Sequence, residues 1–365
     1  MTAVKPVLDT YLELNLVIFL ALIVWLVVRW GLERTSFRMA FFAQLRVLKI
    51  LLLCIVLSPL LAAGFVAVLG VVSPDRPVAI GDIAVAAYLR GDIAMPATQL
   101  EHLLQTRERW VDALLNGGSV FAFVLLAGLL AGAVLLSLRI AQAALCIQAT
   151  IATSILWRQS NKVDIRFSDH ISVPFAVRGL RRRHVVLPSH LVAQPRDLRF
   201  ALAHEFQHIR AGDIEWELAM EFLRPLFFWN PAFLILKYQF ERLRELGCDQ
   251  SIVARGHLNS ADYAKCLLDY CAQTVSRKNA KVLNVALVGG GRAKHVLKQR
   301  MIALTETPSC GHPTQLLVFG IAMVLAVTLA IGSASMRQTS DWTHDRLMLS
   351  TVVNLERLAE RNRGN

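Results

Sequence analysis

The sequence predicts a mainly α-helical integral membrane protein that carries a cytoplasmic α+β domain. The chain has 365 residues, of which 55% are hydrophobic and only 18% charged, and its mean hydropathy is +0.47. This composition is too apolar for an ordinary soluble protein of the same length. Four apolar stretches near the length of a membrane span and an uneven distribution of the +12 net charge complete the prediction.

The four apolar stretches are predicted transmembrane helices, because about 20 apolar residues cross a hydrocarbon core of roughly 30 Å. They comprise residues 15–30, 50–72, 119–138 and 314–332. The first stretch is short enough for a signal peptide. However, Asp9 and Glu13 precede it and no small-residue cleavage site follows, which favours a retained span.

Charge predicts the topology, because basic residues accumulate in the cytoplasmic loops of membrane proteins. The loop between the first two spans has five basic residues and one acidic residue, Glu33, which predicts that it is cytoplasmic. The basic residues are Arg29, Arg34, Arg38, Arg46 and Lys49. The loop 73–118 has four basic and six acidic residues and is predicted to be exported. Residues 139–313 hold 24 Lys and Arg against 14 Asp and Glu, and so carry ten of the twelve net charges. We therefore expect a multi-pass protein of a bacterial inner membrane, with a cytoplasmic domain over 139–313.

The remaining segments follow from this assignment. Residues 1–138 form a membrane region with three spans, 314–332 the fourth span, and 333–365 a short exported tail. Both the N-terminus and the tail are then outside. The tail has apolar residues at near-helical intervals, which suggests an amphipathic helix; they are Leu347, Val352, Leu355 and Leu358. This helix would contact a partner protein, lie on the membrane surface, or be a frayed terminus without a role.

The cytoplasmic domain is predicted to begin with a small sheet and to continue with helices. Period-2 or β-prone patterns predict strands, and period-3.6 patterns bounded by capping residues predict helices. The expected strands cover 163–167, 171–177 and 183–187, and the expected helices 195–212, 214–228, 232–254, 261–274 and 292–305. Pro225 and the pair Asn230-Pro231 are expected to break the helical array.

His204-Glu205-Phe206-Gln207-His208 is an HExxH sequence inside one of these helices. The i, i+4 spacing brings both imidazoles to one face, where they can share one Zn²⁺. Glu205 follows the first histidine directly and can act as the base that takes a proton from the attacking water. The chemistry indicated is metal-assisted hydrolysis of an amide. A helix with two solvated histidines would look the same, so the motif depends on its context.

A downstream acidic helix supplies that context, because a catalytic zinc needs a third protein ligand. Glu245 and Asp249 lie one turn apart, so one can ligate the metal while the other supports a ligand histidine. The alternative is a solvated face with i, i+4 ion pairs. Cys248 lies between them, but we leave it out of the predicted site because a lone helical cysteine is more often part of a core.

Several other classes of function are excluded. The six cysteines form no CxxC pair, which argues against a zinc ribbon or a disulfide scaffold. Gly289-Gly290-Gly291 lacks the lysine of a nucleotide-binding loop. Arg181-Arg182-Arg183 is a short basic run without a recognition helix, so direct contact with nucleic acid is not expected.

Residues 202–253, with LAHEFQHIRAGD, FFWNP and RELGCDQSIV, resemble the antirepressor metallopeptidases of the BlaR/MecR type, which are integral-membrane gluzincins. VRGLRRRHVVLPSHL resembles the strand region of that family. The resemblance implies three spans, a cytoplasmic zinc domain and a fourth span. It also implies that His204, His208 and Glu245 ligate Zn²⁺, that Glu205 is the general base and that Asp249 supports a ligand histidine. Asp213 matches the pattern after HExxH, without a clear role.

The resemblance implies a membrane-embedded zinc endopeptidase that cleaves a cytoplasmic protein, such as a transcriptional repressor, after an external signal. Residues 333–365 hold no SxxK motif, so direct acylation by a β-lactam is not expected. An HtpX-like housekeeping protease and a non-catalytic membrane receptor are the alternatives. The expected partners are the protein substrate and membrane lipid, and a homo-oligomer is left open.

Two further expectations concern peptides. A substrate should add as a strand to one sheet edge, along 171–177 or along 183–187. The segment 276–294, with polar and Gly-rich flanks, is a candidate site of self-cleavage, although an ordinary strand is the simpler interpretation.

Overall fold

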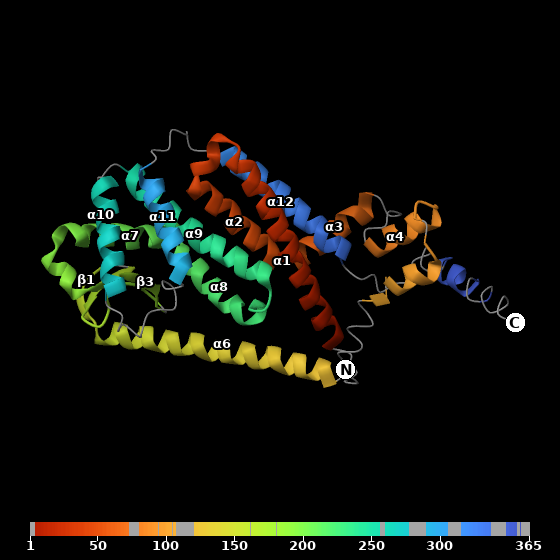
Figure 1. The fold of residues 1–365 in the computed structure, drawn as a ribbon, viewed down its shortest axis with the longest axis horizontal. Coiled ribbons are helices and arrows are strands. Elements are labelled where there is room, and N and C mark those ends of the chain that lie inside the picture. Colours follow the sequence, from red (N-terminus) through yellow and green to blue (C-terminus); the bar gives the residue numbers. More distant parts are fainter. Residues whose placement is uncertain are drawn as a thin grey trace. The chain divides into compact units, whose positions relative to one another are not determined.

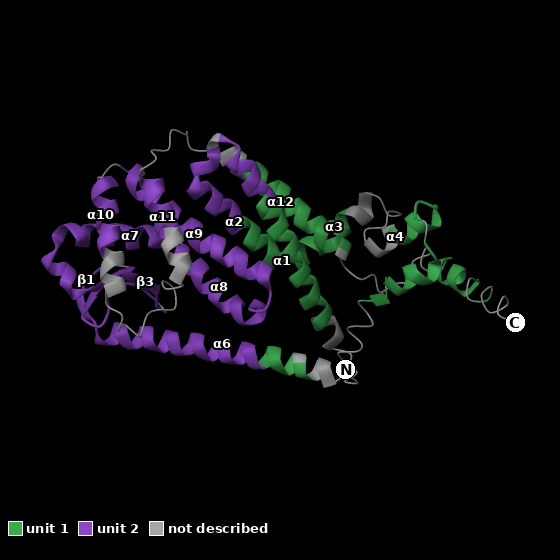
Figure 2. Cartoon of the chain, in the orientation of Figure 1, with its two compact units in different colours: residues 1–26, 50–130, 319–365 green, residues 27–49, 131–318 purple. Residues whose placement is uncertain are grey.

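The structure is a computed structural model in which two compact units are distinguished (Figure 2). Unit 1 comprises residues 1–26, 50–130 and 319–365, and unit 2 comprises 27–49 and 131–318. The described residues are 4–72, 80–93, 95–103, 105–106, 120–160, 162–179, 181–255, 260–276, 290–305, 315–336, 348–355 and 358. The candidate self-cleavage segment therefore lies largely outside the described residues.

The long apolar helices agree with membrane association. α1 (Val4–Glu33), α6 (Val120–Thr153) and α12 (Gln315–Met336) each contain a stretch long and apolar enough to cross a membrane. A bent pair, α2 (Phe41–Val56) and α3 (Ser58–Val72), can be counted as one more span. The described residues thus hold three such helices, or four with the bent pair.

The second predicted span differs from expectation, because residues 50–72 do not form one straight helix. α2 begins well before residue 50, and its axis meets that of α3 at 74°. Pro59 is the second residue of α3 and has no N–H to continue the hydrogen-bond ladder of α2. The break therefore falls where proline interrupts the backbone.

The tail forms part of a small core in unit 1. Leu349 and Val353 are buried against Val85 of α4 (Ile80–Leu89) and against Ala97 and Leu100. Of the predicted apolar face, Val352 packs against this core, Leu355 and Leu358 are exposed, and Leu347 lies outside the described residues.

Unit 2 contains a four-stranded sheet of order β1-β2-β4-β3 (Figure 1). Its strands are β1 (Ile155–Gln159), β2 (Val163–Ser168), β3 (Phe175–Arg178) and β4 (Arg183–Pro188). β2 and β4 are parallel, and the other two pairs are antiparallel. β1 was not predicted, and the run 171–177 becomes a strand only after Pro174. The expectation that 183–187 forms an edge is wrong, because β4 pairs on both sides.

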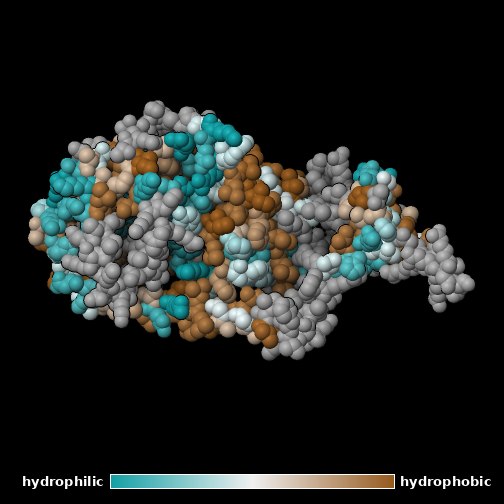
Figure 3. Space-filling view, in the orientation of Figure 1, coloured by the Kyte–Doolittle hydropathy of each residue, from teal (hydrophilic) through white to brown (hydrophobic). Residues whose placement is uncertain are grey.

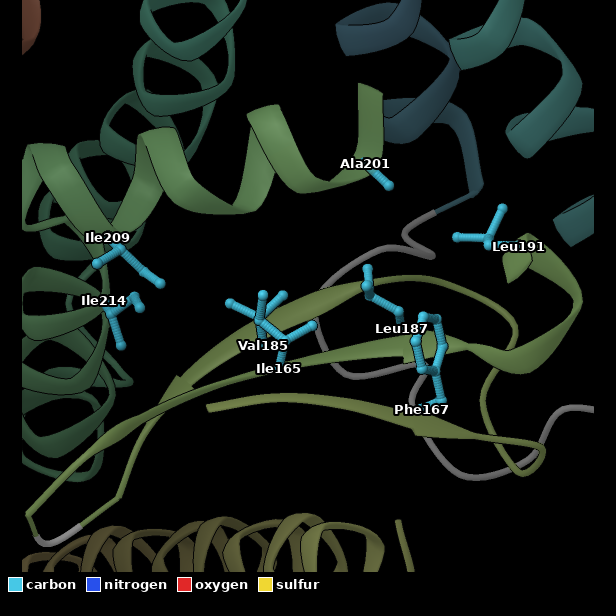
Figure 4. Close-up of a cluster of buried hydrophobic side chains, with 8 residues drawn as sticks. All are labelled: Ile165, Phe167, Val185, Leu187, Leu191, Ala201, Ile209 and Ile214. Carbon is cyan, nitrogen blue, oxygen red and sulfur yellow. The ribbon is translucent and has the colours of Figure 1, made fainter. Parts of the chain in front are cut away.

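One helix covers the sheet. After the short helix η2 (Ser189–Ala193), α7 (Pro195–Ala211) lies across the face formed by β2 and β4. Ile165, Phe167, Val185 and Leu187 point from the strands toward this helix, as Figure 4 shows. Ala201, Ile209, Leu191 and Ile214 complete the core. This apolar contact holds α7 in one orientation and so fixes the direction of its opposite face.

The other helices of unit 2 follow the predicted order. They are α8 (Asp213–Phe227), α9 (Pro231–Ala254), α10 (Ser260–Ser276) and α11 (Gly290–Thr305). Asn230 caps α9 by accepting a hydrogen bond from the amide of Ala232 at 2.9 Å. Pro225 does not break α8, contrary to expectation, because it lies only two residues before the helix ends.

The segment from the end of α1 to the first half of α2 belongs to unit 2 and is attached to α9. Arg29 donates to Gln239 at 3.0 Å, and Gln250 donates to the carbonyl of Met39 at 2.8 Å. A short helix, η1 (Ser36–Met39), lies within this segment. Residues far apart in the sequence therefore build one body around α9.

Candidate metal centre

α7 brings the residues of the HExxH motif to one buried face. The helix begins with Pro195 at its first position and ends at Gly212, as predicted. Gly212 has φ 67°, a left-handed conformation that glycine adopts without strain. Glu205 and His208 are buried. The local sequence thus sets both ends of the helix and the spacing of its polar groups.

Three ligand atoms converge between α7 and α9. The Nε2 atoms of His204 and His208 are 3.1 Å apart. Oε2 of Glu245 lies 3.5 Å from Nε2 of His204, and Oε1 lies 3.7 Å from Nε2 of His208. Ligands about 2.0–2.1 Å from a tetrahedral metal are about 3.3 Å from one another. The observed separations therefore fit one metal ion held by these three residues.

Asp213 orients the second histidine. Its Oδ2 lies 3.0 Å from Nδ1 of His208, and its Oδ1 accepts from Nζ of Lys49 at 2.8 Å. A carboxylate only accepts, so Nδ1 of His208 carries the hydrogen and Nε2 presents a lone pair. Asp213, whose role the sequence left open, thus fixes a tautomer.

A tyrosine orients the first histidine. The hydroxyl of Tyr263 lies 2.9 Å from Nδ1 of His204 and donates to Oδ1 of Asp249 at 2.7 Å. Because its hydrogen goes to Asp249, the hydroxyl accepts from Nδ1 of His204. Arg300 holds Asp249 through two hydrogen bonds of 2.6 and 2.8 Å. Asp249 therefore reaches His204 mainly through Tyr263, since its own oxygen is 3.8 Å from Nδ1.

The two tautomers have an electrostatic consequence. When both rings are neutral, their Nε2 atoms direct lone pairs into the same gap of 3.1 Å. Two lone pairs this close repel each other unless a positive charge lies between them or one nitrogen is protonated. Metal ligation by neutral imidazole removes the repulsion, and the arrangement is the usual one for histidines supported by carboxylates.

The charges around the site favour a cation at the histidines. Burial by itself lowers the pKa of His204, but the Cys248 thiolate and the hydrogen bond with Glu245 raise that pKa to about 10. Burial raises the pKa of Glu245, but His204, Arg300 and Arg244 together hold it well below its usual range. Arg244 and Arg300 lie 3.0 and 3.2 Å from this carboxylate. Glu245 is therefore ionised.

Cys248 is closer to the histidines than the sequence analysis assumed. Its Sγ lies 3.4 Å from Nδ1 of His204, and the three residues offer ligand atoms within 4.8 Å of one another. Burial raises the pKa of this thiol, but His204 and His208 lower it below its usual value. The contact at 3.4 Å is with the nitrogen that Tyr263 also binds, whereas Glu245 faces both Nε2 atoms. We therefore favour Glu245 as the third ligand.

Glu205 is buried beside the three converging ligands. Burial raises the pKa of its carboxyl group, and the nearby histidines oppose that shift only in part. A carboxylate with a raised pKa is a better proton acceptor, which suits a general base near neutral pH. Glu205 is therefore a buried carboxyl group with a raised pKa next to the two histidines and Glu245.

Three residues of this centre were missed in the sequence analysis, namely Lys49, Tyr263 and Arg300. Each makes a contact at the centre with a residue at least 50 positions away in the sequence, although Tyr263 also contacts Asp249, which is 14 positions away. A buried tyrosine needs a hydrogen-bond partner, but the sequence offers no means of choosing that partner. No local pattern identifies these residues.

Comparison with known proteins supports the predicted family. The model of a family described as BlaR1 peptidase M56 matches residues 10–304, which is most of the chain. No curated protein matches the sequence. The matched region contains α7, α9, Tyr263 and Arg300, and so includes every residue described at the candidate metal centre.

Proposed function

Because the chain belongs to the BlaR1 peptidase M56 family, we propose that it is a membrane-embedded zinc endopeptidase that cleaves a cytoplasmic protein in response to an external signal. A transcriptional repressor is the first candidate substrate. The observation that carries the proposal is the convergence of two Nε2 atoms and the Glu245 carboxylate at separations that fit one metal ion.

Each residue has a distinct role in this proposal. His204, His208 and Glu245 would hold Zn²⁺, which when bound polarises the scissile carbonyl as a Lewis acid. Glu205 accepts a proton from water and later delivers it to the leaving amine. Asp213 and Tyr263 hold the two imidazoles in the tautomers that ligation needs.

The sheet offers an edge for the substrate. β3 is the last strand on its side of the described sheet, and β4 is interior. An extended peptide that pairs with β3 would present its carbonyl groups along that edge by strand addition. Of the two edges expected from the sequence, the proposal therefore retains the region of residues 171–177 and rejects 183–187.

The small core of unit 1 supports the proposed topology. The loop between α3 and α6 and the tail after α12 pack on one another through Val85, Leu100, Leu349 and Val353. Segments that share a core lie on the same side of a membrane. An even number of crossings must then separate them, as α6 and α12 provide. The exported placement of both segments and the cytoplasmic placement of the zinc domain agree with this count.

Two alternatives make different predictions. A non-catalytic receptor has no need for a buried glutamate with a raised pKa beside the ligands, so Glu205 argues against that class. An HtpX-like housekeeping protease would cleave many unrelated proteins, whereas an antirepressor would cleave few. The number of substrates therefore separates the two enzyme classes.

The decisive experiment compares the protein fragments in cells that express the wild type, Glu205→Gln or Glu33→Gln. Glu33 is an exposed residue at the end of α1 and provides a matched control. We expect one or a few cytoplasmic fragments with wild type and with Glu33→Gln, and none with Glu205→Gln. Fragments that persist in Glu205→Gln at wild-type levels would remove this residue from the mechanism.

A second experiment identifies the third ligand. Elemental analysis of the detergent-solubilised protein should find about one zinc per chain in the wild type and in Cys248→Ala, and much less in Glu245→Gln. The reverse result would make Cys248 the ligand in place of Glu245.

A further inference from the structure

The corner between α8 and α9 buries Met220, Phe227, Phe233 and Leu236, but it also exposes large apolar side chains on its outer face. Leu218 and Phe222, one turn apart on α8, are 61% and 76% exposed. Leu234 and Ile235 on α9 are each 42% exposed. In water, a helical hairpin normally buries such residues and exposes its charges.

Charged residues lie between the same two helices. Lys237 of α9 lies 2.8 Å from Glu221 of α8 and also forms an ion pair with Glu241. Arg224 lies 3.3 Å from Glu221. The side chain of Lys237 is only 13% exposed, so this charge is less accessible than the phenyl ring of Phe222. Charges that are paired between the two helices, together with apolar side chains on the outer face, suit a helical hairpin that is surrounded by lipid.

A contact with α6 marks the depth of this corner. A Cβ at Gly132 of α6 would lie 2.6 Å from Cζ of Phe228, so glycine allows the phenyl ring to approach the helix backbone. Gly132 lies in the half of the predicted span 119–138 that is nearer the zinc domain, and none of the candidate span Leu126–Thr153 is buried. Figure 3 shows hydrophobic residues along this helix. The turn between α8 and α9 therefore contacts α6 at a level where α6 is itself suited to lipid.

We propose that this corner, residues 218–237, is immersed in the cytoplasmic leaflet of the membrane beside α6. Its exposed apolar side chains contact lipid acyl chains, and its charges stay paired between the helices. The continuity with α6 favours lipid over a second copy of the chain, because α6 offers an apolar surface on which no residue of the span is buried.

The immersion also limits the position of the metal centre. Phe222 lies nine positions after Asp213 along α8, and Glu245 lies ten positions after Ile235 along α9. At 1.5 Å per helical residue, the metal centre lies on the order of 15 Å from the immersed side chains. The site therefore works close to the membrane surface.

The test uses the full chain in vesicles that contain a phospholipid with a photoreactive diazirine in its acyl chain. After illumination, mass spectrometry locates the labelled residues. We expect Leu218 and Phe222 to be labelled to a similar extent as Leu130 and Leu135 of α6, which are exposed residues in or beside its span. Leu268 of α10, an apolar residue with 49% exposure, is the control and should show background labelling.

Labelling of Leu218 and Phe222 no stronger than that of Leu268 would overturn the proposal. Cross-links between two copies of the chain through these residues, without lipid label, would likewise overturn it and assign the surface to a dimer. The measurement uses the wild-type protein and needs no variant to fold.

Matched charge substitutions provide the second test. A carboxylate at the centre of a lipid-facing surface is strongly unfavourable, so Phe222→Asp should reduce the folded protein recovered in vesicles by about tenfold or more. Leu268→Asp should leave the recovery unchanged. Equal recovery of the two variants would contradict immersion, because a residue in water tolerates the change in either place.

Discussion

α7 and α8 are consecutive helices that meet at Gly212, and both bury apolar residues, but they differ in where their other side chains lie. α7 turns Ala201 and Ile209 toward the sheet and its histidines toward α9. α8 turns Leu218 and Phe222 outward and keeps Glu221 in ion pairs with α9. Both helices are amphipathic, so the pattern of the sequence does not say which face is buried. The surroundings of each helix decide this.

The largest effect should come from the polar face of α7. His204→Ala or His208→Ala removes one of three ligands, so the affinity for zinc should fall on the order of a thousandfold or more. His170→Ala, an exposed histidine of the same unit, should retain full affinity. Titration with a competing zinc chelator measures the three affinities. Normal binding in His204→Ala would show that the metal is held elsewhere.

The apolar faces of the two helices can be compared directly. Ile209→Ala in the core under α7 should lower the free energy of unfolding by about 2–5 kcal/mol, because it opens a cavity. Leu218→Ala on α8 should change this free energy by no more than about 0.5 kcal/mol, as at an exposed position. Unfolding in detergent micelles measures both. Equal losses would mean that the outer face of α8 is packed against protein.

The groups that orient the histidines should have an intermediate effect. Asp213→Asn keeps the shape of the side chain but weakens its hold on Nδ1 of His208, so the zinc affinity should fall by about 10–100-fold. Lys49→Met, one contact further away, should have a smaller effect of the same sign. A chelator titration checks both. An unchanged zinc affinity in Asp213→Asn would show that the contact between Asp213 and His208 does not affect metal binding.

The zinc affinity should depend on pH. The pKa of His204 in the metal-free site is about 10, so zinc must displace a proton at neutral pH. The affinity should therefore rise by up to about tenfold per pH unit and per displaced proton between pH 7 and 9. A raised pKa also stabilises the metal-free fold fully below about pH 6.5, and this contribution is lost as the pH rises through 10. Calorimetry in two buffers counts the released protons.

The smallest effect concerns the link between the sheet and α8. Burial by itself raises the pKa of Glu215, but its hydrogen bonds and ion pairs with Arg183 and Arg178 lower that pKa below its usual value. Its contribution to stability is present above about pH 4.5 and is lost as the pH falls through its lowered pKa. Glu215→Gln should cost less than about 1 kcal/mol at pH 7, because the pair is partly exposed. The difference from wild type should vanish in acid.

The sequence by itself determined the features that depend on neighbouring residues. Pro195 and Gly212 bound α7, the i, i+4 spacing places His204 and His208 together, and the apolar lengths of α1, α6 and α12 indicate membrane helices. These features result from interactions within one or two helical turns, or from composition over about 20 residues. They could therefore be predicted without knowledge of the fold.

Only the tertiary structure decided which distant groups complete the site. Tyr263 and Arg300 reach the centre from α10 and α11, and Lys49 from α2, because packing of whole helices brings them there. The same holds for β4, whose pattern fits an edge or an interior strand until its two partners are known. A long-range contact depends on the position of every element between its partners, so no local pattern in the sequence can encode it.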